Sequence, residues 1–101
     1  MNPDGTATSR VFKLREKDLG ELSVDVCSLT SPEKSVGDPM KYFLFEISNK
    51  SVLNLPQIKL QTFYDPLPNN LNDAHAVIVG MTIEDEITPG LLARASKKVF
   101  I

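Results

Sequence analysis

The side chains best suited to chemistry gather in one short stretch, Asp65–His75. It contains two prolines, three asparagines, two aspartates and the only histidine of the chain. An imidazole beside a carboxylate is the minimum equipment for general acid–base catalysis near neutral pH. Asp73 lies two residues before His75 and Asp65 lies ten residues before it, while Asp25 lies on the polar side of an earlier strand pattern. One hypothesis is therefore a small hydrolase or nucleotide-processing enzyme. In it His75 is the base, and one of these three carboxylates orients the ring or binds a metal.

The same stretch also allows interpretations without catalysis. Its polar side chains can form a binding surface, whose candidate residues are Asp65, Asn69, Asn70, Asp73 and His75. Asn and Asp in such loops most often bond to nearby backbone and thereby stabilise turns. A lone histidine at the start of a strand usually orients a loop in the same way. We therefore keep His75, Asp25 and Asp73 as catalytic candidates beside a structural role for the histidine.

Cys27 is the only cysteine of the chain. A single cysteine excludes an internal disulfide and any zinc site built from cysteines. With His75 as base its thiol could be a nucleophile, whereas the common role of such a residue is a small, buried or half-buried side chain. The five glycines are isolated, so there is no glycine-rich phosphate loop. We expect no resident metal and no cofactor.

Length and charge limit the class of protein. A chain of 101 residues makes one domain. Its 11 Lys and Arg against 13 Asp and Glu give a net charge of −2, which argues against nucleic-acid binding. No apolar run approaches the roughly 20 residues that span a bilayer, and the start lacks the apolar part of a signal peptide. We expect a soluble cytoplasmic protein without membrane contact, with a flexible start at 1–9 and one domain over 10–101.

Apolar periodicity predicts the strands that position these residues. We expect strands at 11–15, 22–27, 41–48, 57–63 and 76–81. In the second of them the outward side chains would be Ser23, Asp25 and Cys27. The aromatic run 41–48 favours a central strand. Two prolines, Pro66 and Pro68, take the chain out of the sheet near Asp65.

Helical signals complete the expected fold. A short helix begins at 30–33, with Ser31 or Thr30 as its cap, and a helical turn follows at 51–55. A longer helix is expected from Thr88 to Lys98, with inward side chains Leu91, Leu92 and Ala95. Residues 99–101 then pair as a last strand or pack on a partner. The fold class is α+β, a mainly antiparallel sheet of about five strands with a short helix and a C-terminal helix packed on it. A crossover through the long helix could add one parallel pair.

Several of these segments resemble a pattern in short, uncharacterised bacterial proteins. The segments are Leu22–Asp25 (LSVD), Leu29–Glu33 (LTSPE), Asp65–Asn70 (DPLPNN) and Ala74–Gly80 (AHAVIVG). The resemblance covers most of residues 10–98 and carries no established activity. This chain departs from the pattern by extra residues between Pro68 and His75 and by Pro89–Gly90 in the last helix. The resemblance implies a prokaryotic accessory protein and draws attention to Asp25 and His75.

The leading functional hypothesis is a binding module that associates with itself, most simply as a dimer. Short apolar strands leave edges that a domain must cover, and dimerisation covers them. The enzyme built on His75 is the second hypothesis. The third is an immunity or antitoxin-like protein, in which the acidic group Glu84–Glu86 would face a basic partner.

Overall fold

The structure is a computed structural model that describes residues 1–38, 40–55, 58–69 and 71–99. Within these ranges it has five strands and three α-helices. The strands are β1 (Glu21–Asp25), β2 (Leu44–Glu46), β3 (Gln61–Tyr64), β4 (His75–Val79) and β5 (Lys97–Val99). The helices are α1 (Pro32–Val36), α2 (Asn49–Leu53) and α3 (Thr88–Ala95), and short 3₁₀ turns occupy Ser9–Phe12, Glu16–Asp18 and Cys27–Leu29. The expected α+β class is confirmed.

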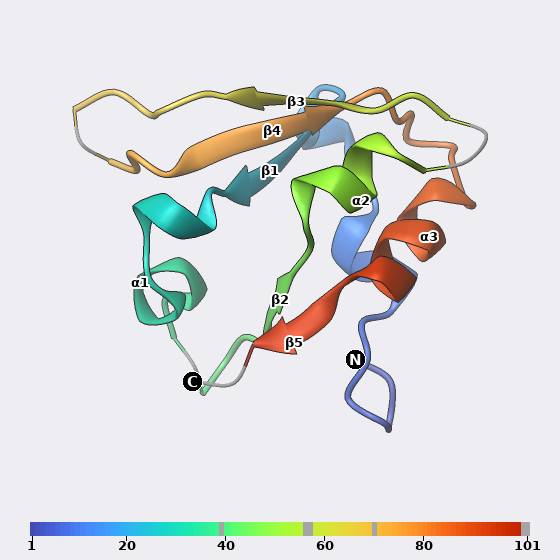
Figure 1. The fold of residues 1–101 in the computed structure, drawn as a ribbon, viewed down its shortest axis with the longest axis horizontal. Coiled ribbons are helices and arrows are strands. Elements are labelled where there is room, and N and C mark those ends of the chain that lie inside the picture. Colours follow the sequence, from blue (N-terminus) through green and yellow to red (C-terminus); the bar gives the residue numbers. More distant parts are fainter. Residues whose placement is uncertain (39, 56–57, 70, 100–101) are drawn as a thin grey trace.

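The strands divide into two sheets, and every strand pair in the described ranges is antiparallel. β4 lies between β1 and β3, whereas β2 pairs with β5 alone. In Figure 1 the three-stranded sheet runs along the top, α2 and α3 lie below it, and β2 and β5 lie lower still. The expected parallel pair is not found among the described strands, because β4 and β5 belong to different sheets. The expected last strand is present as β5, and Phe100 and Ile101 lie outside the described residues.

β4 is the buried strand that the apolar run predicts. Ala76, Val77 and Ile78 are all buried, in a strand that has a neighbour on each side. The strand begins at His75 and ends at Val79, slightly earlier than the expected 76–81. The expected strand at 57–63 and turn at 51–55 are present with shifted bounds, as β3 and α2.

Two strand predictions are wrong. Residues 11–15 are the end of a 3₁₀ turn and an extended segment outside any strand, although Phe12 and Leu14 are buried. The 41–48 run is not a central strand, because only its middle residues form β2, which pairs on one side with β5. Tyr42 and Phe43 are 56% and 59% exposed. A high strand propensity therefore measures the fit of a side chain to a half-buried pleated surface and does not fix a place in the sheet.

The starts of α1 and α3 agree with the sequence signals. Ser31 accepts a hydrogen bond from the backbone N–H of Lys34 at 3.3 Å, and Pro32 opens α1. α3 begins at Thr88 as expected but ends at Ala95, where the chain turns into β5. The expected inward position of Ala95 is wrong, because the buried residues of α3 are Thr88, Pro89, Leu92 and Ala93. No helix in the described ranges is long and apolar enough to cross a membrane.

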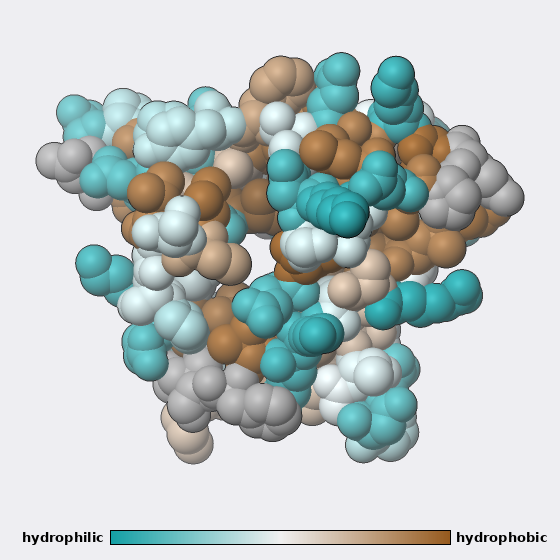
Figure 2. Space-filling model, viewed as in Figure 1, coloured by the Kyte–Doolittle hydropathy of each residue, from teal (hydrophilic) through white to brown (hydrophobic). Residues whose placement is uncertain are grey.

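The core joins the first 3₁₀ turn, the three-stranded sheet, α2 and α3. Its largest buried members include Phe12, Leu22, Val52, Leu60, Ile78, Met81 and Leu92. Ala7 belongs to the same cluster, so the N-terminal segment reaches the core at this residue. Beside the core the surface is hollowed between the three-stranded sheet and β2, and brown side chains line part of the hollow (Figure 2).

Gly80 ends β4 in a conformation that only glycine adopts at low cost. Its φ is +119°, and a Cβ atom at this residue would lie 2.9 Å from the carbonyl oxygen of Lys59 and 3.1 Å from a methyl carbon of Leu60. We expect Gly80→Ala to lower the free energy of unfolding by roughly 1–3 kcal/mol, measured by urea denaturation.

The matched control is Gly90→Ala in α3. A Cβ atom there has nothing within 4 Å, and alanine favours a helix over glycine by about 1 kcal/mol. This variant should therefore unfold at a higher urea concentration than the wild type. Equal stability of the two variants would contradict the strained turn at Gly80.

Candidate functional site

His75 occupies the first position of the middle strand. Its partner across the β1–β4 ladder is Asp25. On the other side the backbone N–H of Asp65 donates to the carbonyl oxygen of His75 at 3.0 Å. The pairing of strands therefore flanks the histidine with two aspartates from distant parts of the sequence, one on each side of β4.

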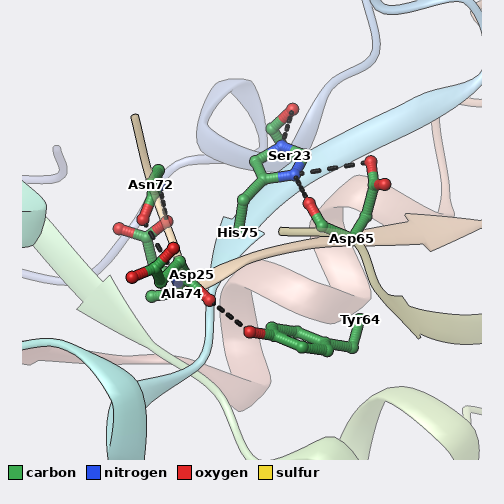
Figure 3. Close-up of polar contacts among 8 residues, drawn as sticks. Ser23, Asp25, Tyr64, Asp65, Asn72, Ala74 and His75 are labelled. Carbon is green, nitrogen blue, oxygen red and sulfur yellow. Dashed lines mark hydrogen bonds and ion pairs between the residues drawn. The ribbon is translucent and has the colours of Figure 1, made fainter. Parts of the chain in front are cut away.

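Both ring nitrogens of His75 have partners, as Figure 3 shows. Nδ1 lies 2.7 Å from the backbone oxygen of Asp65. A carbonyl oxygen can only accept, so Nδ1 carries the proton in this contact. Nε2 lies 3.2 Å from the hydroxyl oxygen of Ser23. In the neutral ring Nε2 has no proton, so the Ser23 hydroxyl donates to it.

A carboxylate completes this line of contacts at longer range. Oδ2 of Asp65 lies 3.5 Å from Nδ1 of His75, and the Asp65 side chain is 56% exposed whereas that of His75 is 13% exposed. The order hydroxyl, imidazole, carboxylate is the one that activates a serine for nucleophilic attack. Of the carboxylates proposed as partners of His75, Asp65 is the one in contact with the ring.

Asp25 serves a different set of contacts. One of its carboxylate oxygens accepts from the amide of Asn72 at 2.8 Å, and the other accepts from the hydroxyl of Ser35 at 2.7 Å. The Asn72 side chain in turn accepts from the backbone N–H of Ala74 at 3.1 Å. Asp25 therefore ties β1 to α1 and to the loop before β4, which favours a structural role over catalysis.

The loop before β4 is an extension of the β3–β4 hairpin. Leu67 and Asn72 form an antiparallel bridge, and Asn69 takes up a left-handed conformation with φ +58° at the tip. The backbone oxygen of Asp73 accepts from the hydroxyl of Tyr64 at 2.6 Å, while its side chain is exposed. Asn69 thus has the turn role that its residue type favours. The candidate Asn70 lies outside the described residues.

The cysteine and the candidate metal ligands do not form a catalytic set. Cys27 is exposed in its 3₁₀ turn, so the expected buried or half-buried position is wrong. The alternating strand ends at Asp25, two residues before the thiol. Within the described ranges no group of three His, Cys, Asp or Glu residues lies close enough to hold a metal ion.

The acidic group Glu84–Glu86 is partly used inside the molecule. Asp85 accepts from the backbone N–H groups of Ile87 and Thr88, each at 2.9 Å, at the start of α3. Lys13 donates to the backbone oxygen of Asp85 at 3.0 Å and pairs with the Glu86 carboxylate at 3.1 Å. Two of the three acidic residues therefore have contacts that fix the helix start.

The sequence analysis did not identify three residues that make polar contacts around His75 and its loop, namely Ser23, Asn72 and Tyr64. Ser23 was on the outward face of its predicted strand, the same face as Asp25. The missing information was the register between this strand and β4, which pairs Ser23 with Val77 and places it diagonally from His75.

Comparison of the chain with protein-family models, with curated proteins and with solved structures found no match. The resemblance to short bacterial proteins therefore depends on the quoted segments alone, and the chemistry of this site has to be argued from its own geometry.

The contact of Asp85 with the start of α3 predicts a pH-dependent stability. Hydrogen bonds from the side chain and backbone of Thr88 hold the pKa of Asp85 below its usual value of 3.8. A depressed pKa means that the stabilisation is complete above 3.8 and is lost as the pH falls through the lower value of the folded state. We expect Asp85→Ala to cost about 1 kcal/mol at neutral pH.

Thermal unfolding across the acidic range checks this prediction. The difference in melting temperature between the wild type and Asp85→Ala should shrink once the pH falls below 3.8. A difference that stayed constant down to the lowest pH would show that the carboxylate charge has no part in the cap.

Proposed function

We propose that this chain is a binding module that associates with itself through the outer edge of β3. The observation that carries the proposal is the composition of that edge. Among the described strands β3 has a neighbour on one side only, and its four residues, Gln61–Tyr64, include no charge and no proline. Natural edge strands are usually protected by charges, prolines or bulges. A strand edge without such protection favours a function in which another strand pairs with it.

Exposed aromatic side chains on β3 support the same proposal. Phe63 is 52% exposed and Tyr64 is 58% exposed. The opposite edge of the sheet is formed by β1, which carries Glu21 and Asp25 at its two ends. Two copies of β3 paired about a two-fold axis would extend the sheet antiparallel and bury the aromatic side chains of both copies.

Phe63→Glu tests this interface. Placing a charge on each copy of the edge removes the burial of an aromatic ring, which contributes about 1.5–3 kcal/mol. We expect the wild type to have twice the monomer mass in light scattering at tens of micromolar, and the variant to be a monomer with an unchanged circular-dichroism spectrum.

The matched control is Ile87→Glu, because Ile87 is 66% exposed and belongs to the start of α3, not to β3. It should leave the mass unchanged. A monomeric wild type, or equal effects of the two variants, would rule out self-association through β3.

A second candidate function has one specific observation in its favour, the hydrogen bond between Ser23 and His75. As a small hydrolase, the protein would use Ser23 as nucleophile, His75 as the base that takes the hydroxyl proton at Nε2, and Asp65 to orient the ring. The exposure of Ser23 in β1 leaves its hydroxyl accessible to a substrate. These are the contacts that an enzyme of the His75 hypothesis needs.

A fluorophosphonate probe tests the serine. Its phosphorus would bond to the Ser23 oxygen, fluoride would leave, and the hydroxyl proton would pass to His75. We expect labelling of the wild type that falls by about 10²-fold or more in His75→Gln, since a general base contributes that much. Peptide mass mapping locates the label, and Ser28→Ala is the control for another exposed serine. Unlabelled wild type, or labelling that survives Ser23→Ala, would remove this candidate.

A further inference from the structure

A groove of about 1080 Å³ lies between the two sheets. Both β1 and β2 line it, together with residues from α1, α2 and β3. Figure 2 shows its opening as the hollow between the upper and lower parts of the molecule. Its volume is slightly above the range of about 300–1,000 Å³ that small-molecule pockets occupy.

The lining of the groove is largely apolar. Val24, Phe45 and Ile47 line it while packing against the core from partly buried positions. Ala76 and Ile78 contribute buried surface from β4. An apolar surface of this kind gains free energy when a ligand removes it from water.

The charges of the groove have one sign. Its described lining includes the carboxylates of Asp25 and Glu46 and includes no Lys or Arg. Asp25 already accepts two hydrogen bonds, whereas Glu46 is exposed in β2. Lys97 pairs with Glu46 across the β2–β5 ladder but is not part of the lining. Phe43 is part of the lining, and the Nζ atom of Lys98 lies 5.0 Å from the centre of its ring. A cation and an aromatic face therefore already meet beside the groove.

Two of the strands that line the groove have an edge without a ladder partner among the described strands. β1 pairs only with β4 and β2 pairs only with β5 among the described strands, so each has an edge without a ladder partner. An extended peptide can add to such an edge, with main-chain hydrogen bonds supplying affinity and alternate side chains supplying specificity.

We infer that this groove binds an extended segment of another protein in which apolar residues alternate with Lys or Arg. The apolar side chains would cover the floor formed by Phe45, Ile47 and Ile78. The basic side chains would lie near Glu46 and Asp25. The open edge of β1 or β2 would supply the backbone hydrogen bonds.

This inference does not depend on self-association. The proposed dimer uses the outer edge of β3, whereas the peptide would pair with β1 or β2. Phe63 and Tyr64 also line the groove, so the two events need separate measurements. Light scattering on the same samples reports the dimer separately from peptide binding.

The test uses a synthetic peptide of about seven residues in which valine and lysine alternate, beside a control peptide in which glutamate replaces lysine. Titration into isotopically labelled protein, followed by amide chemical shifts, should move the β1 or β2 amides with the lysine peptide only. Glu46→Gln should weaken binding by roughly two- to fivefold, whereas Glu84→Gln, an exposed glutamate outside the groove and outside the strands, should leave it unchanged.

Three results would overturn the inference: equal binding of both peptides, shifts that lie outside the groove, or no shift at millimolar lysine peptide. The variants themselves remain folded in this test, because both glutamates are exposed and each change keeps the shape of the side chain. Weaker binding of the lysine peptide at higher salt would agree with the charge argument.

Discussion

The register of β4 between β1 and β3 is the constraint on which the rest of the structure depends. It aligns His75 with Asp25 on one side and brings Asp65 to it on the other. The same register places Ile78 beside Leu22 on the core face. A slip of one residue would exchange the two faces of the strand and move the apolar set toward water. The burial of β4 therefore fixes both the core and the place of the imidazole.

Around this strand, polar side chains join segments that are distant in sequence. Asp25 joins β1 to α1 through Ser35 and to the hairpin through Asn72. The ring of His75 links β1 to the residue that follows β3. These ties lie at the end of the sheet where β4 begins, so the most polar stretch of the chain is held in place by bonds to residues distant in sequence.

Elements that depend on local sequence signals could be predicted, whereas the pairing of the strands could not. The starts of α1 and α3 follow from Ser31-Pro32 and Thr88-Pro89, and the buried β4 follows from its apolar run, because each signal lies within a few residues. The division into two sheets depends on β2 choosing β5, a choice between distant segments that propensity does not encode. The Ser23–His75 contact was missed for the same reason, since it needs the β1–β4 register. The sequence also could not separate two of the carboxylates proposed as partners of His75. Asp65 contacts the ring, whereas Asp25 accepts its hydrogen bonds from Asn72 and Ser35.

The geometry of His75 also bears on the choice between binding and catalysis. Its Nδ1 proton is directed at a backbone oxygen at 2.7 Å, while the Asp65 carboxylate lies farther away at 3.5 Å. A carbonyl fixes the tautomer and orientation of the ring, but it carries no full negative charge to stabilise an imidazolium. The carboxylate that could do so is more than half exposed, where water screens its interaction. The internal contacts of the ring therefore favour the binding proposal, with His75 joining β1 to the residue that follows β3. Among the described strands, β1, β2, β3 and β5 each have an edge without a ladder partner, and a partner chain can satisfy such an edge as another strand would.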